Sequence, residues 1–220
     1  MTKLFQNIDT FESLTIAAPV KRDSSLTAKI HFEPIQFGEI ENPICVVEEV
    51  IRKHKARAMR LSMDKIATVW IERLEQEVKH AMVEESAEWF GKRFTMGTID
   101  RMHCSSLVND EIIVRCTKDM TSFKYNHDDG TLKRVELQEI KEGDLVVPIL
   151  LLEGLFIGPK HFTPSFTISN ILSVGKIESD TAHPFSEVGR TEEIIDPFSF
   201  YTRGETDSNG SFDTHIFQTD

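Results

Sequence analysis

Few cysteines and no long apolar run occur in this sequence, which excludes several protein classes. Of 220 residues only three are cysteine, Cys45, Cys104 and Cys116, and no two have CxxC spacing. An odd number without that spacing predicts neither a disulfide framework nor a zinc knuckle. No stretch of about 18 apolar residues is present, and the N-terminal MTKLFQNIDTFE lacks the apolar segment of a signal peptide. We therefore expect a soluble, intracellular protein without a membrane partner.

Positive charge is also scarce. The formal net charge is −11, and ten acids but only three bases fall between Lys176 and Asp220. That segment has a net charge of −7, which leaves −4 for residues 1–175. An acidic total disfavours a nucleic-acid partner, but an acidic tail on a nearly balanced body can also shield the binding surface of that body. The charge therefore leaves a nucleic-acid partner open.

Catalytic motifs are missing as well. The glycines form no phosphate-binding loop, and the histidines and cysteines lack the spacing of metal ligands. Glu139-Ile140-Lys141 has the Glu-x-Lys spacing of metal-dependent nucleases, with Asp119 upstream. In a chain with 28 % charged residues such a set arises by chance. We predict that the protein is not an enzyme and has no catalytic residue, metal or cofactor, with a nuclease as the minor alternative.

Two strands and a turn are predicted between Gly143 and Val174. Asp144 to Ile157 is rich in Val, Ile and Leu, Gly158-Pro159-Lys160 suits a chain reversal, and apolar alternation resumes from Phe162. The first strand is apolar on both faces and the second on one, which is typical of a central strand beside a half-buried one. This pattern predicts the closing hairpin of a barrel or sandwich.

The remaining apolar pattern is also mainly that of short strands. A strong hairpin turn is predicted at 126–130, where Asp129-Gly130 tolerates positive φ. Ser62 to Phe90 has apolar residues at three- and four-residue steps, with Ser62 as the expected cap, Gly91 as the stop and Trp70 in the core stripe. Further strands are expected at 13–17, 27–32, 44–50, 111–117, 122–125 and 131–137.

Three clusters of basic and aromatic residues are candidates for nucleic-acid contact. Residues 52–60 are rich in Lys and Arg, with a solvated connection into the helix as the alternative. Aromatics and cations also meet at the helix end and on the hairpin 118–134, where alternation separates Phe123 and Tyr125 from Lys124 and one face could be core. The candidate DNA-binding residues are Arg52, Lys53, Lys55, Arg57, Trp89, Lys92, Arg93, Lys118, Phe123, Lys124, Tyr125, Lys133 and Arg134.

The order of elements predicts the fold class. Short strands, one long helix, a hairpin and a final pair of strands suit a mainly β, five-stranded barrel of the oligonucleotide-binding (OB) type. We expect an N-terminal arm at 1–12, an OB-like β-barrel domain at 13–177 with its helix at 62–90, and an acidic, partly disordered tail at 178–220.

Several of these segments carry a resemblance to viral proteins. Trp89-Phe90-Gly91-Lys92, the strand from Glu111 and the stretches 143–157 and 166–174 resemble a family of uncharacterised proteins of large DNA viruses. The order of strands and helix resembles the single-stranded-DNA-binding proteins of T7-like phages and their proposed giant-virus relatives. The resemblance spans roughly 12–176 and implies an OB fold that coats single strands, with an acidic tail that recruits polymerase or helicase partners. The tail departs from the phage pattern in its composition. Its acids are mixed with other residue types, and it ends in Phe217-Gln218-Thr219-Asp220 and not in a dense acidic run with a terminal aromatic.

Together these observations predict a single-stranded-DNA-binding protein that acts as an accessory factor in viral replication or recombination. Its expected partners are single-stranded DNA and replication proteins that bind residues 196–217, and a homo-oligomer is left open. The expected location is the host cytoplasm or nucleus at the site of viral replication, or the virion. The alternative is a virion structural or assembly protein whose barrel and Phe-containing tail bind other proteins.

Overall fold

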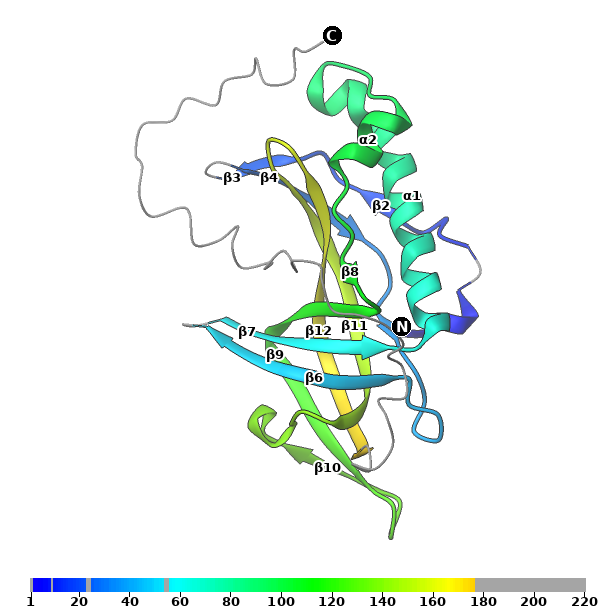
Figure 1. Cartoon of the computed structure of the whole chain (residues 1–220), viewed down its shortest axis with the longest axis vertical. Coiled ribbons are helices and arrows are strands. Elements are labelled where there is room, and N and C mark those ends of the chain that lie inside the picture. The colour runs from blue at the N-terminus through cyan, green and yellow to red at the C-terminus, as the bar shows by residue number, and fades with distance from the viewer. Residues whose placement is uncertain (1, 9, 23–24, 54–55, 177–220) are drawn as a thin grey trace.

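The computed structural model describes residues 2–8, 10–22, 25–53 and 56–176. In this part the chain is mainly β, with helices α1 (Lys65–Phe90) and α2 (Met96–Met102) to one side of the strands (Figure 1). The predicted tail at 178–220 lies outside the described residues. Neither described helix is long and apolar enough to span a membrane.

Five strands close into a barrel, which confirms the predicted OB-like class. Hydrogen-bonded neighbours follow one another in the order β6, β7, β9, β12 and β11, and β11 returns to β6 through Leu145 opposite Val46 and Val146 opposite Cys45. Only the β9–β12 pair within this ring is parallel. The ring consists of β6 (Cys45–Lys53), β7 (Ala56–Met63), β9 (Glu111–Asn126), β11 (Asp144–Ile157) and β12 (Phe162–Lys176).

The β11–β12 hairpin is longer than the barrel and supports a second group of strands. Its start and turn agree with the sequence prediction, and its far half pairs with β4 (Ser25–His31), for example Leu155 opposite Ala28. This hairpin therefore joins the barrel to the N-terminal strands (Figure 1). The small elements around it are β1 (Lys3–Leu4), η1 (Phe5–Asn7), β2 (Thr15–Ile16), β3 (Val20–Arg22), β5 (Ile35–Gln36), β8 (Leu107–Val108), β10 (Thr131–Val135) and η2 (Leu137–Glu139).

Helix α1 covers the core with one face, as its apolar spacing predicts, but it starts later than expected. Asp64, not Ser62, is the N-cap, and its side chain accepts a hydrogen bond from the Ala67 amide at 2.8 Å. Ser62 instead belongs to β7. Gly91 ends the helix at a φ of 67°, a left-handed conformation that favours glycine.

The first residues of the chain contribute to the core, which differs from the predicted arm at 1–12. The Phe5 ring is 1 % exposed and stacks on Phe37 with centroids 5.2 Å apart. The Trp70 indole lies edge-on to both rings and donates to the Ile8 carbonyl at 3.3 Å. Trp70 is therefore a core residue, as its place in the apolar stripe predicts.

The basic segment 52–60 is part of a hairpin and not a connection into the helix. β6 continues to Lys53, and β7 returns from Ala56 with Arg52 opposite Arg57. Met59, Leu61 and Met63 point into the core from alternate positions of β7. The sequence prediction missed this strand because it contains no Val, Ile, Thr or aromatic residue, the types that are enriched in strands.

A single long strand replaces two predicted ones at 111–117 and 122–125. Cys116 pairs with Ile168 and Thr121 with Asn170, so residues 117–120 bulge out opposite Ser169. On the other edge β9 pairs first with β7 and, beyond the bulge, with β10. The predicted turn at 126–130 is confirmed, because the Gly130 amide donates to the Asn126 carbonyl and Gly130 has a φ of 67°.

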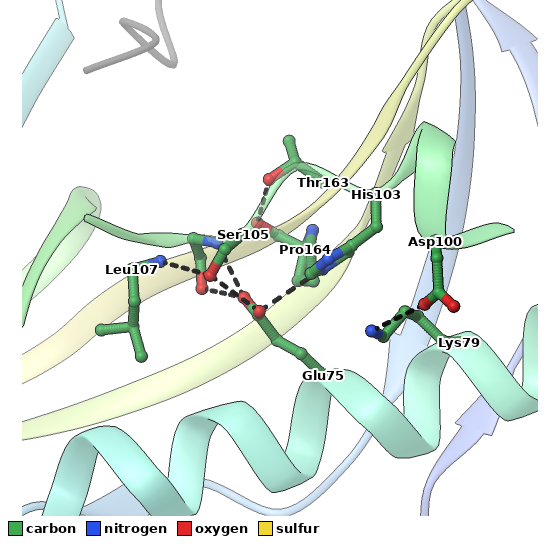
Figure 2. Close-up of polar contacts among 9 residues, drawn as sticks. Glu75, Lys79, Asp100, His103, Ser105, Leu107, Thr163 and Pro164 are labelled. Carbon is green, nitrogen blue, oxygen red and sulfur yellow. Dashed lines mark hydrogen bonds and ion pairs between the residues drawn. The ribbon is translucent and has the colours of Figure 1, made fainter. Parts of the chain in front are cut away.

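A buried carboxylate ties α1 to the tip of the β11–β12 hairpin (Figure 2). Glu75 is 3 % exposed and accepts hydrogen bonds from Ser105 Oγ at 2.9 Å and from the amide and hydroxyl of Ser106. The His103 ring lies 3.4 Å from the carboxylate, and burial lowers its pKa against the opposing effect of Glu75. The next amide, of Cys104, donates to the Phe162 carbonyl, so Glu75 fixes a segment that in turn holds β12.

Candidate nucleic-acid interface

The register of β9, β10 and β12 sorts the hairpin residues onto two sides. Phe123 lies opposite Arg134 on one neighbouring strand and Leu172 on the other. Ser122, with Val135 and Ile171 beside it, forms the adjacent row. Because neighbouring residues of a strand point to opposite faces, these two rows lie on opposite sides of the sheet.

Phe123 and Tyr125 are on the side that faces away from the core. Val135 and Ile171 belong to the hydrophobic core, whereas the rings of Phe123 and Tyr125 are half-buried and do not pack against it. Tyr125 is held edge-on by the His127 ring at 4.9 Å, and His127 also hydrogen-bonds the Val174 carbonyl. The rings are thus positioned at the surface of the barrel, where core burial does not account for them.

We call the outward-facing residues of this strand the outer row of β9. Ile112 and Val114 point into the core, so Arg115 points outward, and beyond the bulge the outward positions are Thr121, Phe123 and Tyr125. Thr121 is hydrogen-bonded to Asn170 of β12. The outer row consists of Arg115, Thr121, Phe123 and Tyr125, with Asn170, Leu172 and Arg134 beside it on β12 and β10.

Lys124 and Lys133 lie on the other side of the same hairpin. They are directly opposite each other, and Ser173 of β12 lies beside Lys124. Sequence alternation predicts this separation of the lysines from the rings. Of the predicted hairpin cations, Arg134 is therefore the one that shares a side with Phe123 and Tyr125.

A second group of cations gathers at the tip of the β6–β7 hairpin. Arg52, Arg57 and Lys118 are exposed, and the β7–β9 pairing brings the bulge that carries Lys118 toward this tip. Burial raises the pKa of the Cys116 thiol to about 11, while the nearby Arg57 charge opposes this shift. Lys55 lies outside the described residues, and of Lys53 only the backbone is described. We call Arg52, Arg57 and Lys118 the tip group.

Trp89, Lys92 and Arg93 are not brought to either group. Trp89 is half-buried, packs against the core and meets the Phe90 ring edge-on at 6.2 Å. Lys92 and Arg93 follow the end of α1, and a helix of 26 residues places them about 39 Å from its start beside the barrel (Figure 1). Packing against the core explains the position of the Trp89 indole. None of the three residues belongs to the outer row or to the tip group.

Two further arginines lie on the outer side of the barrel, of which Arg60 falls in the basic segment 52–60 and Arg115 was not predicted as a candidate. Arg115 forms an ion pair with Glu153 and donates to Ser165 Oγ at 3.2 Å. Arg60 of β7 lies between Glu49 at 3.2 Å and Glu111 at 3.8 Å. The alternation of Arg115 with Ile112 and Val114 could have marked it as an outward cation, but its carboxylate partners are far away in sequence.

The three residues of the nuclease-like pattern belong to local elements of the fold. Glu139 closes a capping box with Glu136 at the start of η2, Asp119 lies in the β9 bulge, and the Lys141 amide donates to Asp144 at 3.1 Å. Within the described ranges, no three His, Cys, Asp or Glu side chains are grouped so that they could hold a metal ion.

Comparisons with known proteins give a family and two similar solved structures. The single-stranded DNA-binding protein from bacteriophage Enc34 is 10 % identical with a TM-score of 0.43, over 78 % of this chain and 96 % of that one. The same phage protein in complex with ssDNA is 10 % identical with a TM-score of 0.41, over 75 % and 98 % of the two chains. No curated protein matches the sequence. Residues 48–184, more than half of the chain, match the group described as "Family of unknown function (DUF5871)", and the protein belongs to that family.

Proposed function

We propose that the protein binds single-stranded DNA along the outer row of β9. The observation that carries this proposal is the position of the half-buried Phe123 and Tyr125 rings on the side of the barrel away from the core, with Arg134 beside them. Aromatic rings stack on bases without regard to sequence, and cations beside them contact the phosphates. A closed five-stranded barrel is the framework on which OB domains do this.

Of the tip group, Lys118 lies in the β9 bulge next to the outer row, whereas Arg57, two positions before the buried Met59, lies on the opposite side of β7. Lys118 precedes Phe123 by five residues on the same strand, so at about 3.3 Å per residue the two are at most about 17 Å apart. A single strand that stacks on the rings can therefore also reach Lys118. The site spans a few nucleotides, at the lower end of the roughly 4–16 that one OB domain covers.

A role in viral replication or recombination is the finer part of the proposal. It rests on the sequence resemblance to viral proteins and on a binding mode without base-specific hydrogen bonds, which suits a protein that coats exposed strands. We also propose that residues 196–217 bind replication proteins.

The salt dependence of binding to an oligo-dT tests this function. If three or four phosphates are neutralised, the log-log slope of affinity against salt should be about −2 to −3, since each single-strand phosphate contributes about 0.7. Fluorescence titration at two salt concentrations gives the slope. Absence of binding at low salt, or an affinity independent of salt, would contradict the proposal.

Removal of residues 180–220 should strengthen DNA binding. The segment 176–220 has a net charge of −7. It starts at the end of β12, the strand that pairs with β9 and its outer row. It therefore competes with phosphate for the same cations, mostly at low salt where screening is weak. The truncated chain should bind oligo-dT more tightly with a melting temperature nearly unchanged. A truncated chain that binds oligo-dT no better, or that melts much lower, would show instead that the tail is an integral part of the domain.

A further inference from the structure

Arg115 is the first residue of the outer row along β9. It is opposite Ala58 of β7 and Thr167 of β12, on the side of β9 away from the core. Lys118 follows three residues later, and Phe123 follows on the same side beyond the bulge. A DNA strand that runs from the rings toward β7 therefore passes Arg115.

An exposed carboxylate already occupies this arginine. Arg115 Nη2 is paired with Glu153 Oε2, and the two side chains are 29 % and 55 % exposed. Glu153 lies at the register shift of β11 between Leu152 and Gly154, where an extra residue turns its side chain toward the outer side. Ser165 Oγ accepts a second hydrogen bond from the same guanidinium nitrogen.

Carboxylate and phosphate are equivalent partners for a guanidinium group, since both present oxygens that match its N–H donors. A pair exposed to this degree is weak in water, so an incoming phosphate can replace the carboxylate. Arg60 is different, because Glu49 and Glu111 flank it from two strands. Arg115 is thus the better placed of the two to exchange its partner.

We propose that Arg115 is a phosphate contact of the DNA-binding surface and that Glu153 holds the place of the phosphate in the free protein. The inference rests on the proposed function. It predicts that Glu153 lowers the affinity for single-stranded DNA, because its charge must leave Arg115 and then remains close to the bound phosphate. Loss of that charge should therefore strengthen binding, through Arg115.

The test compares two charge-neutralising variants of the full chain on an oligo-dT at low salt. Glu153→Gln should bind about two- to fivefold more tightly than the wild type, the range expected for release of one exposed ion pair. Glu84→Gln makes the same charge change on α1, away from β9, and should leave the affinity unchanged. In a protein that already carries Arg115→Gln, adding Glu153→Gln should give no gain in affinity for oligo-dT. Arg115→Met, which keeps an aliphatic side chain without the charge, replaces Arg115→Gln if the latter lowers the melting temperature.

The outcomes separate this inference from the function itself. Wild-type binding with no gain in Glu153→Gln, or with equal gains in Glu84→Gln or without Arg115, overturns the inference and leaves the function standing. A wild type that does not bind oligo-dT overturns both. A gain that depends on Arg115 and fades with salt supports the exchange.

Discussion

Replacement of Phe123 and Tyr125 together by alanine is expected to weaken binding to oligo-dT at least thirtyfold. Each base stacked on a ring contributes about 1–3 kcal/mol, so loss of two rings removes about 2–6 kcal/mol, and 2 kcal/mol corresponds to about thirtyfold in affinity. Both rings lie outside the core, so the cost in stability should stay below the about 3–5 kcal/mol of a core Phe→Ala change. Fluorescence titration and thermal melting of the same variant measure both effects.

Two controls locate the effect on one side of the hairpin. Trp89→Ala removes an aromatic ring that packs against the core at the end of α1, so it should lower the melting temperature and leave the affinity unchanged. Arg134→Ala should weaken binding more than Lys133→Ala, because only Arg134 shares the side of the rings. A double variant that melts like a core mutant yet binds normally would show that the outer row is structural.

Among the substitutions proposed here, Glu75→Ala is expected to lower the free energy of unfolding most, by about 3–5 kcal/mol. The change removes a buried carboxylate and leaves the Ser106 amide and two hydroxyls without their acceptor. The segment 103–106 would then lose its anchor on α1, and with it the support for Phe162 in β12. Chemical denaturation gives the free energy of unfolding.

Comparison with Glu72→Ala isolates the role of burial. Glu72 is exposed on the same helix, and its removal should change the free energy of unfolding by about 0.5 kcal/mol or less. Glu75→Gln keeps the size of the side chain and one acceptor oxygen, so its effect should fall between the two. Equal stability of the Glu72 and Glu75 alanine variants would contradict the role assigned to the buried carboxylate.

Much of the fold could be predicted because the apolar pattern of the chain is locally consistent. Asp144 to Ile157 forms one strand with the predicted bounds, and Gly91 ends the helix as its position suggests. Strand β7 could not be found in this way, because it contains no Val, Ile, Thr or aromatic residue and so gives no strong strand signal, although its partner β6 was expected at 44–50. The bulge in β9 was also missed, since it is set by pairing with β12 and not by local sequence.

The site was predictable in its residue types but not in its geometry. Alternation separates Phe123 and Tyr125 from Lys124, yet which side is core depends on Ile171 and Val135 on other strands. Lys92 and Arg93 at the helix end lie next to aromatic residues in sequence, as the hairpin cations do. The length of α1, however, places them away from the barrel surface. The partnership of Arg115 with Glu153 joins positions 38 residues apart, which composition does not reveal.

Ultraviolet cross-linking of oligo-dT to the full chain, followed by mass spectrometry of tryptic peptides, tests the central claim most directly. Phe123 and Tyr125 fall in different tryptic peptides, 119–124 and 125–133, whereas Trp89 falls in 80–92. If single-stranded DNA lies along the outer row of β9, the nucleotide adducts should appear on the first two peptides and decline with rising salt. Adducts confined to 80–92, or absent from 119–133 under conditions where the oligonucleotide binds, would contradict the account.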